Sequence, residues 1–447
     1  MSSNPEPAPY KKDLDTKLAD AQVAWKAPSI SAAVVRDGQI TWQGSVGVAD
    51  TDGQRAGPDT QYRIGSITKT FTAVLVHQLR DEGLLDLDDP LDRWLPDSKH
   101  AHVTLRRMLA HGSGLQRELG DMWATLEVPD RDDLLAGFEA AEQVLPTRKG
   151  HHYSNLAFAI LGEVVGRATS STWPEQLEHR LLQPLGMTRT TYHPTAPRAT
   201  GYLVEPYADA VRPEPDSDLG STAPAGQLWS TSTDLARWAA FLADPDPDVL
   251  SPDTLEGMRQ PVVVFDPHAW NLAWGGGLML WRRDKRVHHG HGGAMPGFLA
   301  GCYAYRDDLE RAGAVVLTNT LRTADPEGLA GELLNAALDA DPRRKPAWVA
   351  SDVPAFAREL LGPWWSEGQE FLVEWREGAL TMTIRGGAEW RRAHFEAIGD
   401  DEYRATKGRE AGERLRVIRS GTTVARLMFS GYAFTRQPLS FTEVAAQ

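Results

Sequence analysis

The segment that most constrains this chain is Ser66-Ile67-Thr68-Lys69, which follows Gly65 and opens a long helical pattern. A serine and a lysine three residues apart on a helix share one face, so hydroxyl and amine are neighbours. If Gly65 marks the turn into the helix, Ser66 lies at its N-terminus, where free backbone N–H groups favour developing negative charge. A neutral Lys69 could then take the Ser66 proton and give a nucleophile. Alone the spacing is weak, because an ordinary helix start with a solvated lysine satisfies it too.

Two later motifs change this interpretation. They are Tyr153-Ser154-Asn155 and the glycine-rich run His291-Gly292-Gly293-Ala294. In this order the three motifs resemble the signature of the serine β-lactamase and penicillin-binding-protein family, of which Ser-x-x-Lys is the first. Tyr-x-Asn in second place, with histidine opening the third motif, is similar to the branch of class C β-lactamases, D-aminopeptidases and esterases. Smaller matches at 108–115 and 226–231 agree, and the resemblance covers roughly residues 12–340.

The resemblance implies a catalytic role for each matching position. Ser66 is the nucleophile that becomes acylated, and Lys69 is the neighbouring base, with an amine pKa lowered by burial and nearby positive charge. Tyr153 relays the proton between Ser66, the leaving group and the incoming nucleophile. Asn155 orients the substrate amide and Lys69. His291 hydrogen-bonds Tyr153 or the substrate carboxylate.

The resemblance also implies an oxyanion hole made by the backbone N–H groups of Ser66 and Ala294. His291 stands where β-lactamases usually carry lysine. A neutral imidazole anchors a carboxylate less well than an ammonium does, so peptide, amide or ester substrates are favoured over penicillins. The candidate substrate-binding residues are Gly292, Gly293, Gln227, Trp270 and Trp274.

Charge and composition exclude several classes of partner. The chain has 47 basic and 61 acidic residues, a net charge of −14, and no basic cluster. Nucleic acids and anionic membranes require concentrated Lys and Arg, so neither is expected as a partner.

The histidines of the third motif could be taken for metal ligands. On a strand, His289 and His291 share a face that His288 does not. No paired ligand completes a site around them, so a metal is not expected. The mechanism that the resemblance implies needs no organic cofactor either. Cys302, the single cysteine, is expected to be a buried, inert thiol.

The first nine residues lack the basic start and apolar run of a signal peptide. No stretch of the chain approaches the apolar length of a transmembrane helix. The sequence therefore predicts a cytoplasmic protein. His151 and His152, just before the tyrosine motif, are expected to pack locally or to lie at the rim of the cleft.

The pattern and the resemblance together predict an α/β fold. It comprises a β-lactamase-like antiparallel sheet flanked by helices, an all-helical subdomain and a small C-terminal antiparallel β-barrel, which the resemblance suggests is lipocalin-like. We expect domains over 10–342 and 350–442, joined by a charged linker at 341–346. Helices are expected over 11–25, 66–83 and 155–167 and from 235, where a capping box precedes the helix. The strands of the sheet are expected over 30–35, 39–46, 278–281, 286–289, 298–305 and 313–318, and those of the barrel over 371–376, 379–385, 415–419 and 424–429. Asp37-Gly38 predicts the first hairpin turn, and residues 194–225 read as a loop that forms one wall of a cleft.

The motifs predict an acyl-enzyme but leave the fate of the acyl group open. Attack by water makes the protein a hydrolase, such as a D-amino-acid peptidase, a cytoplasmic esterase or a weak β-lactamase. Attack by an amine makes it an acyltransferase. One subset of the family, the penicillin-binding-protein-type thioesterases, carries a similar C-terminal barrel and cyclises nonribosomal peptides taken from a carrier-protein thioester.

We therefore expect a small peptide or peptidyl thioester substrate with a D-residue at the acyl position. A carrier protein is the expected partner if the protein is a thioesterase. The remaining alternative is a non-catalytic binding or sensor module on the same fold. The intact set of Ser66, Lys69 and Tyr153 argues against that alternative.

Overall fold

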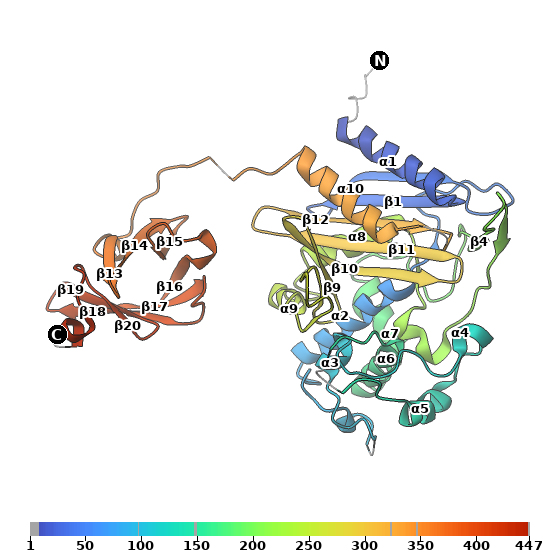
Figure 1. Ribbon diagram of the computed structural model, residues 1–447, viewed down its shortest axis with the longest axis horizontal. Coiled ribbons are helices and arrows are strands. Elements are labelled where there is room, and N and C mark those ends of the chain that lie inside the picture. Colours follow the sequence, from blue (N-terminus) through green and yellow to red (C-terminus); the bar gives the residue numbers. More distant parts are fainter. Residues whose placement is uncertain (1–8, 97, 147–149, 322–323, 346, 446–447) are drawn as a thin grey trace. The chain divides into compact units, whose positions relative to one another are not determined.

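The computed structural model describes residues 9–96, 98–146, 150–321, 324–345 and 347–445. The chain divides into two compact units, Met1–Lys345 and Pro346–Gln447 (Figure 1). The first unit contains the three motifs, and the second is formed mainly of short strands.

The first unit is built on an eight-stranded antiparallel sheet with the strand order β2-β1-β12-β11-β10-β9-β8-β7. The strands are β1 (Ser29–Arg36), β2 (Gln39–Gly47), β7 (Val263–Val264), β8 (Leu272–Trp274), β9 (Met279–Arg283), β10 (Arg286–Met295), β11 (Phe298–Arg306) and β12 (Arg311–Thr318). The predicted turn between β1 and β2 is confirmed, because Asp37 and Gly38 both have the positive φ that a two-residue hairpin turn requires. Strand β10 extends beyond the predicted 286–289, so the third motif lies within the sheet.

Helices cover both faces of this sheet (Figure 1). Helices α1 (Pro9–Trp25) and α10 (Pro326–Ala340) pack on one face, and α8 (Ser232–Ala243) packs on the other. The strand residues alternate accordingly, with Ala314 and Val316 facing α10 and Val315 facing α8. Both faces are buried, which explains the continuous apolar runs of β1 and β12. The predicted α/β fold is therefore confirmed.

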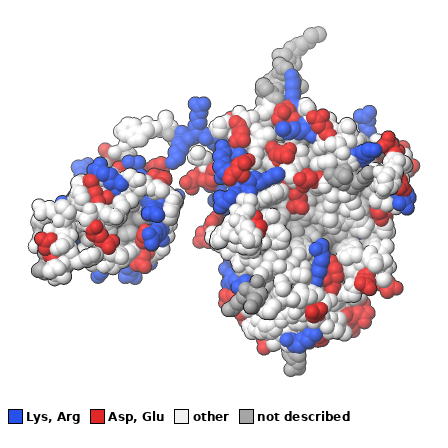
Figure 2. Space-filling view, viewed as in Figure 1, with Lys and Arg blue, Asp and Glu red and all other residues white. Residues whose placement is uncertain are grey.

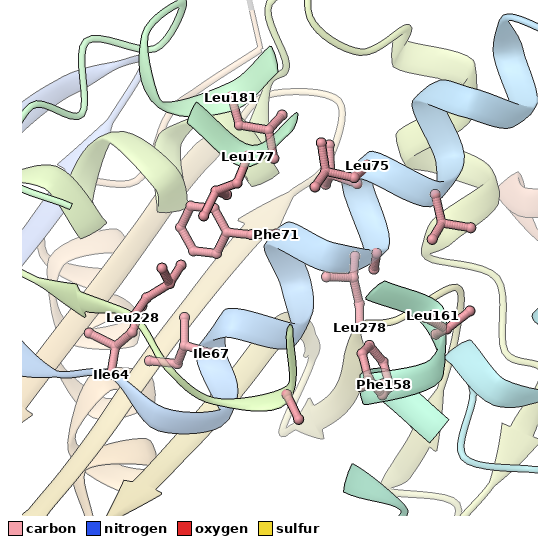
Figure 3. Close-up of a cluster of buried hydrophobic side chains, with 14 of the residues drawn as sticks. Ile64, Ile67, Phe71, Leu75, Phe158, Leu161, Leu177, Leu181, Leu228 and Leu278 are labelled. Atoms are coloured by element: carbon pink, nitrogen blue, oxygen red, sulfur yellow. The ribbon is translucent and has the colours of Figure 1, made fainter. Parts of the chain in front are cut away.

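Helix α2 (Thr68–Asp81) passes through the centre of the first unit, and every residue from Thr68 to Leu79 is buried. Figure 3 shows Phe71 and Leu75 of α2 among leucines from neighbouring segments. Phe71 also stacks on Trp238 of α8, with ring centroids 3.8 Å apart. Burial of each such side chain contributes about 2 kcal/mol, so α2 is a firmly held support for the serine that precedes it.

The other helices form the predicted helical subdomain and its connections. They are α3 (Leu105–Leu109), α4 (Met122–Thr125), α5 (Arg131–Ala140), α6 (Asn155–Thr169), α7 (Trp173–Leu177), a π-helical turn Glu178–Leu182 and α9 (Pro252–Met258), with 3₁₀ turns at Gly65–Ile67, Leu91–Arg93 and Gly220–Ala225. Short pairs of strands are β3 (Tyr62–Arg63) with β6 (Trp229–Ser230) and β4 (Tyr202–Val204) with β5 (Val211–Pro213). Helix α8 begins at Ser232, three residues before the prediction, because the Thr231 hydroxyl caps it by accepting from Asp234 N.

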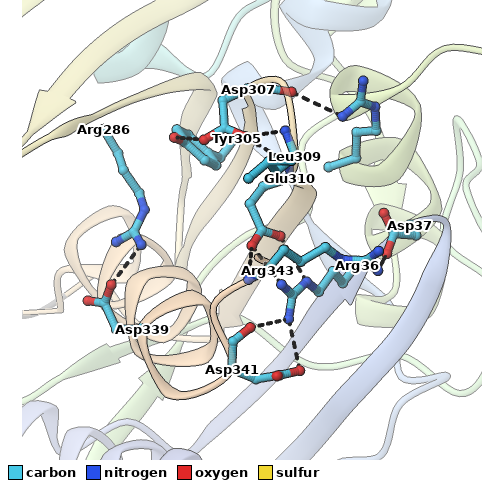
Figure 4. Close-up of polar contacts among 11 residues, drawn as sticks. Arg36, Asp37, Arg286, Tyr305, Asp307, Leu309, Glu310, Asp339, Asp341 and Arg343 are labelled. Atoms are coloured by element: carbon cyan, nitrogen blue, oxygen red, sulfur yellow. Dashed lines mark hydrogen bonds and ion pairs between the residues drawn. The ribbon is translucent and has the colours of Figure 1, made fainter. Parts of the chain in front are cut away.

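A network of charged side chains fixes the end of the first unit (Figure 4). Arg36 of β1 donates to both carboxylate oxygens of Glu310, at 2.6 and 2.9 Å, and to the backbone oxygen of Asp341. The backbone N–H of Arg343 donates to the same Glu310 carboxylate at 3.0 Å. Such bidentate, charge-assisted contacts are directional. They tie the segment after α10 to the end of β1 and to the turn before β12.

The second unit is an eight-stranded antiparallel barrel in which the strands follow chain order. Its strands are β13 (Gly362–Ser366), β14 (Gln369–Arg376), β15 (Ala379–Ile384), β16 (Ala393–Gly399), β17 (Glu402–Lys407), β18 (Arg414–Ser420), β19 (Thr423–Phe429) and β20 (Tyr432–Phe434). Trp365 and Thr435 exchange two backbone hydrogen bonds and so connect the first strand to the end of the last. Helices α11 (Ala355–Arg358) and α12 (Phe441–Ala445) and a 3₁₀ turn at Glu389–Arg391 complete the unit. The predicted C-terminal barrel is confirmed, with four strands beyond the four expected.

Candidate active site

Ser66 lies in the 3₁₀ turn Gly65–Ile67, directly before the buried helix α2. One turn later, the Nζ atom of Lys69 is 3.0 Å from Ser66 Oγ. Lys69 is fully buried, and its Nζ also donates to the backbone oxygen of Ala225 at 2.6 Å. The structure therefore places hydroxyl and amine in hydrogen-bond contact, with the amine held from a second side.

The environment of Lys69 favours its neutral form. Burial lowers the pKa of Lys69 well below its ordinary value, the positive charge of Arg117 lowers it further, and Glu118 acts in the opposite direction. A buried ammonium loses its hydration, so desolvation dominates. A neutral amine in contact with a hydroxyl has a lone pair that can accept the hydroxyl proton. Lys69 is thus suited to act as the base for Ser66.

Tyr153 completes the set around the Ser66 hydroxyl. It hydrogen-bonds to Ser66, and burial raises the pKa of Tyr153 above its ordinary value despite that hydrogen bond. Lys69 Nζ lies 5.0 Å from the centre of the Tyr153 ring. His111 stacks on the same ring, with centroids 4.1 Å apart. A phenol that stays protonated can donate its proton and take up another, but it is not a base in the resting enzyme.

Asn155 is the first residue of α6, which Ser154 caps by accepting from Ala157 N. The Asn155 side-chain amide donates to the carboxylate of Glu118. Its Oδ1 atom is buried and has no hydrogen-bond partner among the described residues. A buried acceptor without a partner is costly. Asn155 Oδ1 is thus an acceptor without a partner in a residue that lines the cavity of Ser66.

Two glycines allow strand β10 to approach the turn that carries Ser66. Gly65 has a φ of +50°, and a Cβ there would lie 2.6 Å from the nitrogen of Ala294. A Cβ at Gly293 would lie 1.9 Å from the backbone oxygen of Ile64. Only residues without a side chain permit this approach. It brings the backbones of Ser66 and Ala294, the predicted oxyanion hole, to the same cavity.

His291 is buried and neutral. Burial, with a smaller effect of nearby Lys69, lowers the pKa of His291 to about 3. Its Nδ1–H donates to the backbone oxygen of Gly292 rather than to Tyr153, whose ring centroid is 6.1 Å away. The predicted hydrogen bond from His291 to Tyr153 is therefore not made in this arrangement. The imidazole instead holds the backbone of the third motif in place.

Ser66 opens onto a cavity of about 420 Å³. Polar side chains of Asn155, Arg117, Glu118 and Glu214 line it, and the apolar part of its wall consists of Met122, Trp123, Leu219, Met295, Pro296 and Leu321. Leu219 and Glu214 come from the segment 194–225, which was predicted to form one wall. This segment also contains β4, β5 and a 3₁₀ turn, so it is more ordered than the expected loop.

Three predicted substrate-binding side chains lie elsewhere. The buried Gln227 amide accepts from Arg63 and from Leu219 N and donates to Tyr192 O. These bonds hold the backbone at Leu219, a residue of the cavity wall, and leave the amide occupied. Trp270 is 69% exposed and lines a separate cavity of about 330 Å³. Trp274 is buried behind Tyr153, where it packs edge-on against His111 with centroids 4.5 Å apart.

The glycines of the third motif have packing roles. A Cβ at Gly292 would lie 2.1 Å from the carboxylate carbon of Glu327. His288 and His289 are likewise engaged in packing, through contacts with Asn335 and with the backbone oxygen of Leu242. Among the described residues, no three His, Cys, Asp or Glu side chains come together so as to hold a metal ion.

Sequence reasoning assigned no role to His111, Arg117 and Glu118. His111 is buried with a φ of +53°, and its Nδ1 accepts from Ser154 N at 3.1 Å. It thereby fixes the backbone beside Tyr153. Arg117 and Glu118 line the cavity with Ser66. Two signals were available. His111 lies within the segment 108–115 that already matched the family, and the charged pair Arg117-Glu118 follows that segment after one intervening residue.

Figure 2 shows acidic and basic side chains interspersed over the described surface that faces the viewer, without a broad basic patch. Within the described part of the chain, every helix is too short or too polar to span a bilayer.

Removing the charge of Arg117 is expected to move the acidic limb of the acylation rate to higher pH. The rate rises with pH as Lys69 loses its proton, and Arg117 lowers the pKa of Lys69. The variant Arg117→Gln raises that pKa, so more alkaline conditions are needed. The Arg117 side chain is 64% exposed, so water screens its charge and the shift should be less than about one pH unit. Pre-steady-state acylation rates between pH 5 and pH 10 measure it, with the exposed Arg376→Gln as control. A limb that moves to lower pH would contradict this electrostatic picture.

Comparison with known proteins agrees with this geometry. The beta-lactamase family matches residues 15–338, and a domain of unknown function, DUF7586, matches residues 353–436. The chain is 31% identical over 295 residues to "Putative beta-lactamase-like 1" of Homo sapiens, covering 58% of this chain and 57% of that protein. It covers 46% of "Beta-lactamase-like protein 2" of Dictyostelium discoideum. The chain thus spans about half the length of these relatives.

Two solved structures are also similar. The crystal structure of SurE is 25% identical with a TM-score of 0.62, covering 96% of this chain and 99% of SurE, and SurE has also been solved with D-Leu. The D-amino acid amidase from Ochrobactrum anthropi SV3, complexed with D-phenylalanine, is 27% identical with a TM-score of 0.62, covering 74% of this chain and 99% of the amidase. The family match spans most of the chain and includes all three motifs at the cavity, so this protein belongs to the β-lactamase family of serine hydrolases.

Proposed function

We propose that this protein transfers acyl groups through Ser66, using peptide amides, esters or thioesters with a D-residue at the acyl position. One observation carries the proposal. A fully buried Lys69 and a partly buried Tyr153 both contact the Ser66 hydroxyl, which opens onto the cavity of about 420 Å³. A solvated lysine at an ordinary helix start would not explain this burial.

The proposed reaction begins when Ser66 Oγ attacks the substrate carbonyl carbon and its proton passes to Lys69. The N–H groups of Ser66 and Ala294 stabilise the negative charge on the carbonyl oxygen. Tyr153 gives its proton to the leaving group and is reprotonated from Lys69. The acyl-Ser66 ester then reacts with water or an amine by the reverse sequence, which restores the Ser66 hydroxyl.

Two observations support a D-residue at the acyl position. The similar amidase is named for D-amino acids, and SurE was crystallised with D-Leu. The apolar side chains Met122, Leu219 and Met295 line the cavity with Ser66, which suits an apolar acyl side chain. The similarity to SurE extends over both units of this chain. We propose that the barrel serves the same reaction as the first unit. One proposed acyl donor is a peptidyl thioester on a carrier protein, and one proposed acceptor of the acyl group is an amine of the same peptide.

A pair of epimeric thioesters tests this function. We expect a short peptidyl N-acetylcysteamine thioester that ends in D-Leu to be consumed at least about tenfold faster than its L-Leu epimer, a difference of ~1.4 kcal/mol in activation free energy. Holding the peptide's own amine near the ester supplies a large effective molarity, so some cyclic product should accompany the free acid. Chromatography with mass detection measures both.

The Ser66→Ala variant supplies the background rate of thioester hydrolysis in the same assay. Equal rates for the two epimers would contradict the D-specific proposal. If free acid were the only product from peptides of several lengths, the protein would be a hydrolase without cyclising activity.

A further inference from the structure

A second cavity, of about 330 Å³, lies where strands β7 to β10 form one end of the large sheet. None of the described residues that line it also lines the cavity of Ser66. Residues paired directly across antiparallel strands point to the same face of a sheet, as do residues two apart on one strand. By these relations a single sheet face supplies the cavity floor, which consists of Val264, Ala273, Leu280, Arg282, Val287 and His289. The floor is thus mainly apolar, and Glu256 of α9 closes one side.

Trp270 forms an aromatic wall of this cavity, although its side chain is largely exposed. Its backbone has a φ of +58°, which is strained for a bulky residue. The carboxylate of Asp266 accepts from Asn271 N and Leu272 N and so fixes the chain directly after Trp270. The indole N–H donates to the Pro267 oxygen at 2.8 Å and holds the ring. Strain that the surroundings enforce in this way is typical of ligand-binding positions.

Two polar groups on the floor lack partners among the described residues. His289 Nε2–H donates to the backbone oxygen of Leu242 at 2.7 Å, so Nδ1 carries a lone pair, and this buried atom accepts no hydrogen bond. Arg282 is exposed, and no described carboxylate pairs with it. Arg259 and Glu256, which also line the cavity, pair with each other at 2.9 Å. The cavity therefore leaves one hydrogen-bond acceptor and one positive charge unmatched.

We propose that this cavity binds the C-terminal residue of a peptide, or an N-acyl amino acid, with an apolar side chain. The carboxylate of such a ligand pairs with Arg282, and its backbone N–H donates to His289 Nδ1. Its side chain packs on the apolar floor beside Trp270. Arginine binds carboxylates through charge-assisted bonds, and an apolar cavity with a few placed polar groups is the usual form of a small-molecule site. Binding there does not depend on acylation of Ser66, so the site goes beyond the function proposed above.

Isothermal titration calorimetry with N-acetyl-leucine, as the separate D and L epimers, tests this site. We expect at least one epimer to bind the natural protein one to one. Arg282→Gln removes the charge that pairs with the carboxylate, so the dissociation constant should rise about tenfold or more. N-acetyl-leucinamide lacks the carboxylate and should bind the natural protein and Arg282→Gln alike. 4-Methylpentanoate lacks the N–H group and should bind more weakly than N-acetyl-leucine, because His289 Nδ1 then stays unpaired.

Two further variants control the experiment. Lys285→Gln removes the same charge from the turn between β9 and β10, outside the cavity, and should change the dissociation constant less than about twofold. Trp270→Gly removes the ring but suits the left-handed backbone, so we expect weaker binding with an unchanged or higher melting temperature. Natural affinity in Arg282→Gln or Trp270→Gly, or an equal loss in Lys285→Gln, would overturn the proposal. Absence of binding by both epimers would overturn it as well.

Discussion

Replacing Lys69 with methionine is expected to lower the rate of Ser66 acylation by a factor on the order of 10² or more, as loss of a general base does. Lys69 Nζ contacts Ser66 Oγ at 3.0 Å, and a thioether cannot take the hydroxyl proton. Methionine fills a similar volume and needs no hydration, so the variant should remain folded, which a thermal melt checks. Stopped-flow measurement of p-nitroaniline release gives the acylation rate. Lys17→Met, on the more exposed helix α1, is the control.

The neighbours of Lys69 sharpen this prediction. Tyr153→Phe should cause a loss of similar size, because it removes the hydroxyl that hydrogen-bonds to Ser66. His291→Ala should lower the rate less, since its imidazole hydrogen-bonds to the Gly292 backbone and to none of the reacting groups. If His291→Ala were inactive while Tyr153→Phe stayed active, the proton-transfer roles would have to be reversed. If Lys69→Met acylated Ser66 at the rate of the natural protein, Lys69 would not be the base.

Local patterns predicted the parts of the fold that local physics determines. Asp37-Gly38 gave the first hairpin turn, because few residues adopt positive φ at both central positions. The capping box predicted over residues 231–234 identified the cap of α8, where the Thr231 hydroxyl accepts from Asp234 N. Strand β16 was not predicted, and its alternation of buried and exposed residues is lost near the bulge at Ala397/Gly399. Strand β17 was not predicted although Tyr403 and Ala405 alternate with polar residues.

The candidate site divides in the same way. Ser66 and Lys69 are neighbours on one helical turn, so their contact follows from spacing. Glu118 reaches the cavity through long-range contacts, since Ser154 Oγ donates to Gln116 O at 2.7 Å and Asn155 N donates to Arg117 O at 2.9 Å. No local pattern specifies such contacts. Trp270 was a candidate because tryptophan suits an apolar cleft, but the sequence does not tell where its side chain points. In the structure it lines a separate cavity.

Replacing Ser66 with alanine is expected to abolish acyl transfer rather than to slow it. Every proposed step passes through the Ser66 oxygen, and Lys69, Tyr153 and the oxyanion hole act only on a nucleophile at that position. Cys302 is not expected to replace Ser66 as the nucleophile, because it is buried and that burial raises the pKa of its thiol. The alanine variant should stay folded, because it removes one oxygen from the surface of the cavity.

Intact-protein mass spectrometry after mixing with an activated D-aminoacyl ester tests whether Ser66 carries the acyl group. We predict a mass increase equal to one acyl group, mapped by digestion to the peptide that contains Ser66, and no such increase in Ser66→Ala. An adduct of the same mass that persists in Ser66→Ala would contradict the account.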